Sequence, residues 1–208
     1  MPVARRRLDV VVGLAGLGVF LLCAFIVRHG TVSSPERADF EAINGLPATF
    51  EPVADGVQFL GTLAIGPIVV IVALLFKRWR LAVAAALVTF TKLAAERIVW
   101  KVLVRERPAV TEPDAIIRGG TATTGPSFVS GHVVLTSGLA WVAMPYLPGR
   151  WKIVPWVIVG TICLARVYLG AHNPLDVVGG AGLGLAIGGL INLIVGVPRS
   201  PSDDSAVV

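Results

Sequence analysis

The sequence predicts an all-α, polytopic membrane protein, with six transmembrane helices packed as a bundle in a single membrane-embedded domain over residues 1–208. Hydrophobic residues make up 55% of the chain, and the mean hydropathy is +0.79. A water-soluble domain of this length cannot bury so much apolar surface. Six apolar stretches approach the length of about 20 residues that crosses a bilayer. Basic residues cluster beside these stretches, as they do in membrane proteins.

The six spans follow one another with short connections. The first is preceded by a cluster of arginines, as a secretory signal is, but its apolar run is long and no small-residue cleavage site follows, so we expect an uncleaved anchor. After it, a proline-rich segment favours a short interfacial helix near 35–44. The last residues, 198–208, are expected to form a flexible tail. The expected spans are 8–27, 57–76, 81–100, 133–147, 153–169 and 177–197.

Positive charge sets the predicted orientation. Basic residues lie at alternate ends of successive spans, and such residues favour the cytoplasmic side. Both termini are therefore predicted to be cytoplasmic, in the plasma membrane, which is the inner membrane of a bacterium. The opposite ends, including the segment 105–132, are predicted to face outward. The basic residues are Arg5, Arg6, Arg7, Lys77, Arg78, Arg80, Arg150, Lys152 and Arg199.

The composition also argues against several kinds of partner. The net charge of +5 is explained by topology and does not indicate nucleic acid. The two cysteines lie inside apolar stretches, which favours neither a disulfide framework nor a thiolate metal site. The sequence predicts no metal and no cofactor. The expected partners are membrane lipids, and a homo-oligomer is compatible with the sequence.

Two of the three histidines fall at the outward ends of different spans. His132 ends a Ser-Gly-His motif, and His172 lies in the motif Arg166-x5-His172-x3-Asp176. A single histidine at a helix end is most often an interfacial polar residue. Two histidines with an arginine and an aspartate at one membrane face instead indicate a site.

Together with Arg107-Pro108, these motifs resemble the three-part signature of the type-2 phosphatidic acid phosphatases, the lipid phosphate phosphatases, in their bacterial membrane branch. The order, the spacing and the membrane placement of the motifs agree with that family. The resemblance implies a metal-independent phosphatase that hydrolyses a lipid phosphate or diphosphate. It also implies that His132 is the general acid that protonates the leaving oxygen, and later the base that activates water.

The chemistry of phosphoryl transfer explains these residue types. Negative charge grows on the phosphoryl oxygens during transfer, and a metal-free site must meet it with fixed positive groups and hydrogen-bond donors. Arg107 and Arg166 suit this role because a guanidinium binds phosphate through two N–H groups. Ser130 and the backbone N–H of Gly131 add donors near the expected start of a helix, where the macrodipole favours an anion.

His172 is the expected nucleophile. A neutral ring nitrogen can attack phosphorus, and a carboxylate that accepts the other ring N–H fixes the tautomer and stabilises the charged intermediate. Asp176, four residues further along the chain, suits that role. Hydrolysis of the covalent phosphohistidine would complete the cycle without a cofactor.

The first motif departs from the family pattern. The position of the usual lysine, seven residues before Arg107, holds Trp100. Lys101 lies about 120° from the face of Arg107 on an ideal helix, so it serves only where the helix ends early. Arg105 is the other candidate for the role.

The second and third motifs each lack one usual neighbour. Val129 stands where a proline precedes Ser-Gly-His, and Ala165 stands where a serine precedes Arg166. A lost hydrogen bond to a charged group costs about 1.5–3 kcal/mol, which slows an enzyme without abolishing its activity.

Other residues have structural interpretations. Lys92 and Glu96, four residues apart in the third span, are expected to neutralise each other. Gly180, Gly184 and Gly188 are expected to allow close helix packing.

No residue chooses the substrate. The resemblance favours a polyprenyl diphosphate recycled for cell-wall synthesis, and phosphatidic acid or phosphatidylglycerol phosphate is the alternative. A lipid phosphotransferase would use the same residues, and the three substitutions leave a non-catalytic membrane relative open. Vanadium-dependent haloperoxidases share the site pattern but are soluble, and a transporter would carry polar groups along the membrane midplane.

Overall fold

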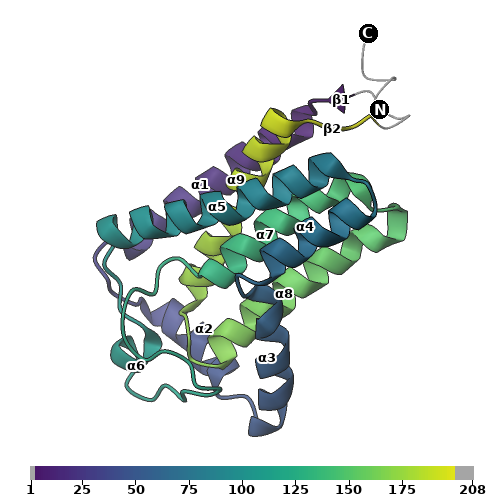
Figure 1. Cartoon of the computed structure of the whole chain (residues 1–208). Helices are drawn as coiled ribbons and strands as arrows, with labels where there is room; N and C mark the ends of the chain where they lie inside the picture. The colour runs from purple at the N-terminus through teal and green to yellow at the C-terminus, as the bar shows by residue number, and fades with distance from the viewer. Residues whose placement is uncertain (1–2, 200–208) are drawn as a thin grey trace.

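Helices form nearly all of the regular structure in the computed structural model, which describes residues 3–199. Long helices lie side by side, and short ones gather at the end away from the chain termini (Figure 1). The α-helices are α1 (Arg7–Val27), α2 (Ser34–Asn44), α3 (Glu51–Gln58), α4 (Ile65–Leu75), α5 (Trp79–Val102), α6 (Pro108–Thr111), α7 (Gly131–Ala143), α8 (Ile153–Tyr168) and α9 (Pro174–Val195). The 3-10 helices are η1 (Ala48–Phe50), η2 (Phe59–Gly61), η3 (Met144–Tyr146) and η4 (Gly149–Lys152), and the strands are β1 (Val3–Ala4) and β2 (Val197–Pro198).

Helix α7 occupies the centre of the bundle. It packs against α5, α8 and α9, and nearly all of its residues are buried. A helix that is surrounded in this way is expected to be apolar on every side, and Val134, Leu135 and Val142 are indeed fully buried. Because α7 is held from several sides, its first residues are fixed at one end of the bundle.

Glycines on two faces of α9 let this helix lie between α1 and α7. A Cβ on Gly184 would lie 2.8 Å from the Ser137 side chain of α7, and a Cβ on Gly182 would lie 2.7 Å from the carbonyl oxygen of Gly16 in α1. Only glycine permits helix axes to approach so closely. The close packing predicted for the glycines of the last span is therefore confirmed.

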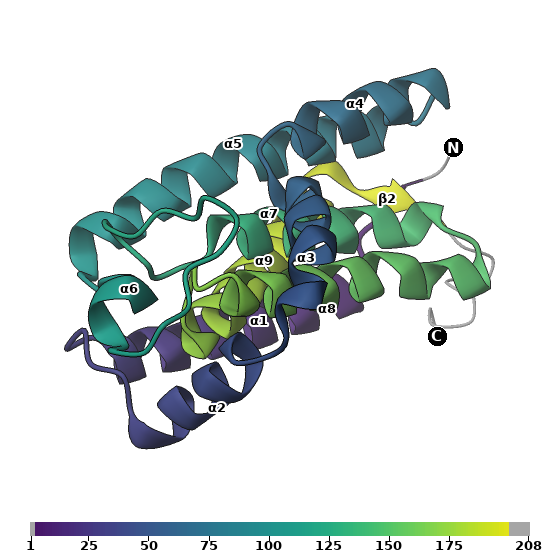
Figure 2. The ribbon, with the colours of Figure 1, turned by 90° about the horizontal axis from the view of Figure 1, so that it is seen from below.

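The short helices form a cap at one end. Figure 2 views the molecule from this end and shows α2, α3 and α6 in front of the long helices, with the connection from α5 to α7 beside α6. The sequence explains the start of α2: the side chain of Ser33 accepts a hydrogen bond from the N–H of Glu36, and Pro35 lies in the first turn. The short helix expected near 35–44 is thus present.

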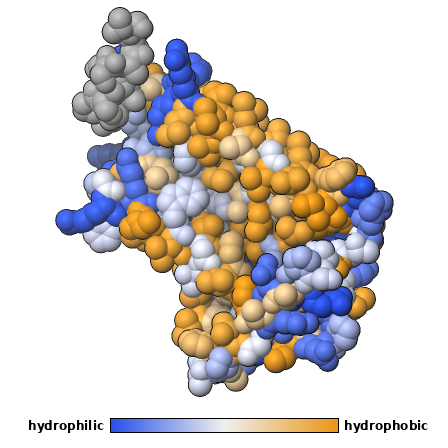
Figure 3. Space-filling view, turned by 180° about the vertical axis from the view of Figure 1, so that it is seen from behind, coloured by the Kyte–Doolittle hydropathy of each residue, from blue (hydrophilic) through white to orange (hydrophobic). Residues whose placement is uncertain are grey.

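The flank of the bundle is apolar. Leu14, Leu22 and Phe25 on α1 are 65%, 61% and 62% exposed. Figure 3 shows apolar residues across the flank, with polar residues near the termini and, at the opposite end, around the short helices. Exposed apolar surface of this extent suits a bilayer and not water. The protein is therefore an integral membrane protein.

The expected spans appear as helices, with one interruption. Three segments are long and apolar enough to cross a membrane: α1, Gly149–Tyr168 and α9. The second expected span, 57–76, is broken, because Ala48–Gly61 and α4 meet at an angle of 63°. Thr62 has an extended backbone, and Pro67 then falls in the first turn of a new helix, where its missing N–H is tolerated.

The remaining two expected spans are α5, which carries Lys92, Glu96 and Arg97, and α7, which has 13 residues. The count of six spans stays a prediction. The expected tail begins later than position 198, because β2 pairs with β1 in an antiparallel ladder. Residues 200–208 of that tail lie outside the described residues.

Candidate active site

His172 lies where the chain reverses between α8 and α9. Gly170 has a φ of 73°, a conformation in which an L side chain is strained. The N–H groups of Ala171 and His172 then donate to the carbonyl oxygen of Arg166. His172 is 3% exposed, and Asp176 follows in the first turn of α9. The turn thus places a buried histidine beside a helix start.

Asp176 and Ser127 lie on the Nδ1 side of His172. The distance from Nδ1 to Oδ2 of Asp176 is 3.8 Å, longer than a hydrogen bond. Ser127 Oγ lies between them: it donates to the same Oδ2 at 2.5 Å and is 3.5 Å from Nδ1. The N–H of Asn173 also donates to Oδ2, at 2.8 Å. Acceptors on this side favour the tautomer with its proton on Nδ1, which leaves the lone pair of Nε2 free.

Burial lowers the pKa of His172 to about 4, against the opposing effect of the Asp176 carboxylate and with a further lowering by the charge of Arg166. The imidazole is therefore neutral near pH 7. Neutral imidazole is the form that can act as a nucleophile.

The first turn of α7 faces this histidine. Ser130 is the N-cap of α7, and its N–H donates to the carbonyl oxygen of Asp176 at 3.1 Å. This bond joins the starts of α7 and α9. His132, the second residue of α7, lies within electrostatic range of His172 and Arg166. Two helix N-termini thus meet at the histidines, and each favours an anion.

Gly131 lies against a buried ion pair of α5. Lys92 Nζ is 2.6 Å from Oε2 of Glu96, so the predicted neutralisation of these residues is confirmed. A Cβ on Gly131 would lie 2.8 Å from both Lys92 Nζ and Glu96 Cδ. The absence of a side chain at position 131 therefore lets α7 start directly against α5, with Lys92 in electrostatic range of His132.

Arg166 and Arg107 bring positive charge to the histidines. Arg166, in the last turn of α8, donates to Oε1 of Gln58 at 2.5 Å. Arg107 precedes α6 and donates to the carbonyl oxygen of Ala171 at 2.9 Å. Both guanidinium groups act electrostatically on His172. The third and first motifs therefore meet in space.

Three predicted site residues have a donor that is buried without a protein partner. Among residues 3–199, these donors are the Nε of Arg105, the Oγ of Ser130 and the Nε of Arg166. Buried polar groups normally have a hydrogen-bond partner. A ligand rich in acceptors, such as a phosphate group, would satisfy the donors of Ser130 and Arg166. With two arginines, two helix starts, a neutral histidine and a second histidine, the arrangement is suited to phosphoryl transfer.

The two candidates for the missing lysine lie in different places. α5 ends at Val102, and the chain is irregular from there to Arg107. Lys101 is exposed in the last turn of α5. Arg105 is 1% exposed, and its guanidinium pairs with the carboxylates of Asp176 and Glu36. The structure thus brings Arg105 to the histidine and leaves Lys101 at the surface.

Three residues outside the predicted site contact the predicted site residues: Ser127, Gln58 and Glu36. Ser127 lies close to the second motif in sequence, and that proximity was its only signal. Gln58 and Glu36 come from α3 and α2, and no local pattern connects them to the motifs.

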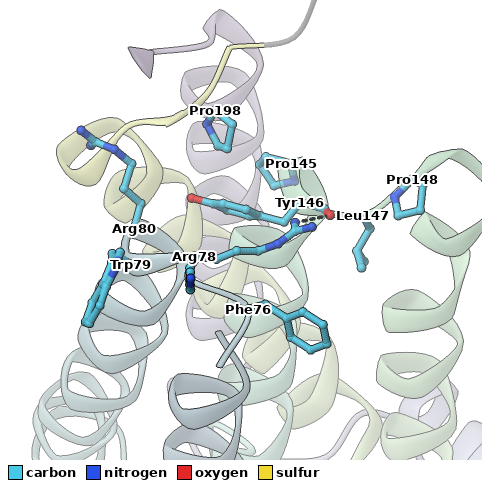
Figure 4. A pocket seen from close by; sticks show the side chains of 10 residues that line it. Phe76, Arg78, Trp79, Arg80, Pro145, Tyr146, Leu147, Pro148 and Pro198 are labelled. Atoms are coloured by element: carbon cyan, nitrogen blue, oxygen red, sulfur yellow. Dashed lines mark hydrogen bonds between the residues drawn. The ribbon is translucent and has the colours of Figure 1, made fainter. Parts of the chain in front are cut away.

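A cavity of about 850 Å³ lies at the far end of α7, beyond Ala143 (Figure 4). Its walls include Phe76, Lys77 and Tyr146, and Arg78 crosses it to donate to the carbonyl oxygen of Tyr146 at 2.6 Å. These residues belong to the predicted cytoplasmic end, so this cavity is separate from the histidines.

The sequence model of the PAP2 superfamily matches residues 57–199, which contain all three motifs. Two solved structures have similar folds. LpxE of Aquifex aeolicus has a TM-score of 0.63 at 24% identity, over 74% of this chain and 92% of its own. The transmembrane PAP2-type phosphatidylglycerolphosphate phosphatase of Bacillus subtilis has a TM-score of 0.70 at 21% identity, over 94% and 97%. No curated protein matches the chain significantly.

Proposed function

The chain belongs to the PAP2 superfamily, and from this premise we propose that it is a membrane phosphatase of lipid phosphates that works through a phosphohistidine on His172. The observation that carries the proposal is the setting of His172: a buried, neutral imidazole with Asp176 and Ser127 on its Nδ1 side and Arg166 close by. This setting suits a group that attacks as a neutral base and then carries positive charge.

The proposed reaction has two steps. Nε2 of His172 attacks the terminal phosphorus, the bond from this phosphorus to the leaving oxygen breaks, and that oxygen takes a proton from His132. The leaving oxygen is the bridging oxygen of a diphosphate or the ester oxygen of a monophosphate. Burial and nearby positive charge lower the pKa of His132 to about 3 in the free site, so the role of His132 as the acid requires that the bound anionic phosphate raise this pKa. Water then attacks the phosphohistidine, its proton passes to His132, and inorganic phosphate leaves. The groups proposed to bind the phosphoryl oxygens are Arg107, Arg166, the hydroxyl of Ser130 and the N–H of Gly131.

A polyprenyl diphosphate is the proposed substrate. Two guanidinium groups, those of Arg107 and Arg166, act on His132, and a diphosphate carries more negative charge for them to offset than a monophosphate does. Phosphatidylglycerol phosphate is the competing substrate, because the Bacillus subtilis neighbour is a phosphatase of that lipid.

The histidines are proposed to face the outside of the plasma membrane, with both termini in the cytoplasm. The distribution of Lys and Arg supports this orientation. Reporter fusions after Lys101 and after Arg150 test it: activity of an external reporter is expected at the first position and activity of a cytoplasmic reporter at the second. The reverse pattern would overturn the orientation while leaving the chemistry untouched.

The reaction is tested with the detergent-purified full chain in the presence of EDTA. Phosphate release is measured from polyprenyl diphosphate, phosphatidylglycerol phosphate and phosphatidic acid, and the relative kcat/KM values rank the substrates. The variant His172→Ala is expected to lose at least about 10³-fold in kcat, because the nucleophile is removed. His29→Ala, which removes the exposed histidine after α1, is the matched control and is expected to keep full activity.

The intermediate is tested separately. Brief incubation with a substrate radiolabelled in its terminal phosphate is expected to leave an acid-labile, alkali-stable label on the wild type and none on His172→Ala. EDTA-sensitive activity, or a label that survives in His172→Ala, would overturn the proposed mechanism.

A further inference from the structure

One buried arginine bridges two carboxylates that lie far apart in the sequence. Nη1 of Arg105 is 2.7 Å from Oδ1 of Asp176, and Nη2 is 2.6 Å from Oε2 of Glu36. Arg105 is 1% exposed, Glu36 5% and Asp176 0%. Charged side chains are almost never fully buried unless they are paired. The three groups therefore depend on one another.

The bridge decides which oxygen of Asp176 faces the histidine. Arg105 occupies Oδ1, so Oδ2 is the oxygen that accepts from Ser127 and lies toward Nδ1 of His172. The terminal torsion of an aspartate is broad and permits rotation of the carboxylate. A guanidinium that holds one oxygen stops this rotation, and its charge favours the ionised carboxylate.

Glu36 extends the bridge to the short helix α2. While its Oε2 holds Arg105, its Oε1 accepts the N–H of Leu175 at 3.0 Å. That N–H is one of the first donors of α9, which have no partner within the helix. Glu36 therefore holds the start of α9 directly and the carboxylate of Asp176 through Arg105.

We propose that Arg105 and Glu36 are positioning residues for the phosphoryl transfer, which hold Asp176 in the orientation that His172 requires and make the docking of α2 a condition for activity. The inference rests on the proposed function, since it takes the roles of His172 and Asp176 from there. It also gives Arg105 a role that needs no contact to phosphate, because each of its terminal nitrogens donates to a carboxylate.

The variants Arg105→Gln, Arg105→Lys and Glu36→Gln test this proposal. In the first and third, kcat is expected to fall about 10- to 100-fold while KM stays within about threefold, because the phosphate-binding arginines are untouched. Arg105→Lys should also lose activity, because a lysine ammonium cannot hold two carboxylates in the planar geometry of a guanidinium. Glu36 acts partly through Arg105. Glu36→Gln should therefore lower kcat by a smaller factor in the Arg105→Gln variant than in the wild type.

Arg37→Gln is the matched control. Arg37 is the next residue on α2, and it also pairs with a distant carboxylate, Glu112, at 2.7 Å. Breaking this pair removes an ion pair of α2 without touching Asp176. Its kcat per folded molecule is expected within about twofold of wild type, because neither residue of the pair contacts Asp176 or His172. Its stability is expected to fall, because the side chain of Glu112 is 3% exposed and loses its partner. Each variant is compared as a monodisperse, folded protein in detergent, and if Arg105→Gln does not fold, Glu36→Gln and Arg105→Lys are judged by the same criteria.

Nitrogen NMR of protein with labelled histidines measures the tautomer of His172 in the absence of substrate. The signals of His172 are identified by their loss in His172→Ala. A single tautomer protonated on Nδ1 is expected in the wild type and in Arg37→Gln, and a mixture in Arg105→Gln and Glu36→Gln. Identical spectra in all four proteins, or unchanged kcat in an active enzyme, would overturn the inference. Failure of the wild type to release phosphate would overturn the proposed function instead, and the spectra would still decide the positioning.

Discussion

Gly61 offers a way to displace His132 without touching a polar group. A Cβ built on Gly61 would lie 2.7 Å from both Cβ and Cδ2 of His132, whereas ordinary contact begins at 3.4 Å. The clash involves the Cβ of His132, which a side-chain rotation cannot move. Gly61→Ala must therefore push the imidazole away, together with the first turn of α7, by roughly 0.7 Å.

A displacement of this size has a large expected effect on catalysis. A misplacement near 1 Å costs about 100-fold in rate, so kcat is expected to fall about 30- to 100-fold, or roughly 2–3 kcal/mol of transition-state stabilisation. KM should change less than kcat, because the arginines proposed to bind phosphate lie on other elements and only Ser130 and Gly131 move with α7. The backbone of Gly61 does not have a positive φ, so alanine adds no strain of its own there.

The assay is phosphate release by the purified variant, with thermal unfolding measured in parallel. Gly56→Ala is the control on the same segment, because a Cβ there would meet nothing within 4 Å, and its kcat should equal that of the wild type. A folded Gly61→Ala protein with kcat within threefold of wild type would refute the reasoning, since it would mean that α7 yields or that His132 is not needed in this position.

Three further outcomes are expected. Because burial lowers the pKa of His172 to about 4, kcat/KM should stay constant as the pH is lowered from 7 and should fall only near pH 4, where His172 becomes protonated. A fall in kcat/KM near pH 6.5, the ordinary pKa of histidine, would contradict this. Gly66→Ala places a Cβ 2.8 Å from Cγ2 of Thr89, so thermal stability should fall by about 1–3 kcal/mol with kcat per folded molecule retained; an unchanged Tm would refute the tight packing of α4 on α5. Asp9 is 0% exposed, pairs with Arg6 at 2.7 Å and accepts a hydrogen bond from Trp141 at 2.9 Å. Asp9→Ala should therefore cost about 3–5 kcal/mol of stability, measured by thermal unfolding. Unchanged stability would show that these bonds of Asp9 contribute little.

The residues of the motifs could be predicted because polar side chains are rare in this chain. With 15% charged residues, most of which mark the ends of spans, a histidine or an aspartate at an outward end has few structural reasons to be there. His172, Asp176 and Arg166 also lie on one short stretch, so a helix end followed by a helix start is enough to place them together. Local sequence therefore carried the information for this half of the site.

The break in the second span could not be predicted in the same way. Residues 57–76 are apolar throughout, and hydropathy does not distinguish a straight helix from one that turns by 63° at Thr62. Yet the break is what brings the backbone of Gly61 against His132. The contact depends on how α4 packs on α5, a long-range property that no window of the sequence contains.

Arg105 shows why a motif can identify a region and leave a role open. In the irregular chain from Leu103 to Arg107, Arg105 and Arg107 turn toward the start of α9, whereas Val104 and Glu106 are exposed. This alternation is the one expected of an extended segment, in which residues two apart share a side. Both arginines are therefore placed to meet an anion, and the sequence does not say which anion each meets. The answer depends on Glu36, because its carboxylate, brought by α2, pairs with one terminal nitrogen of Arg105 while Asp176 pairs with the other. The hydrogen bonds of Arg107 go to backbone carbonyl oxygens and not to a carboxylate.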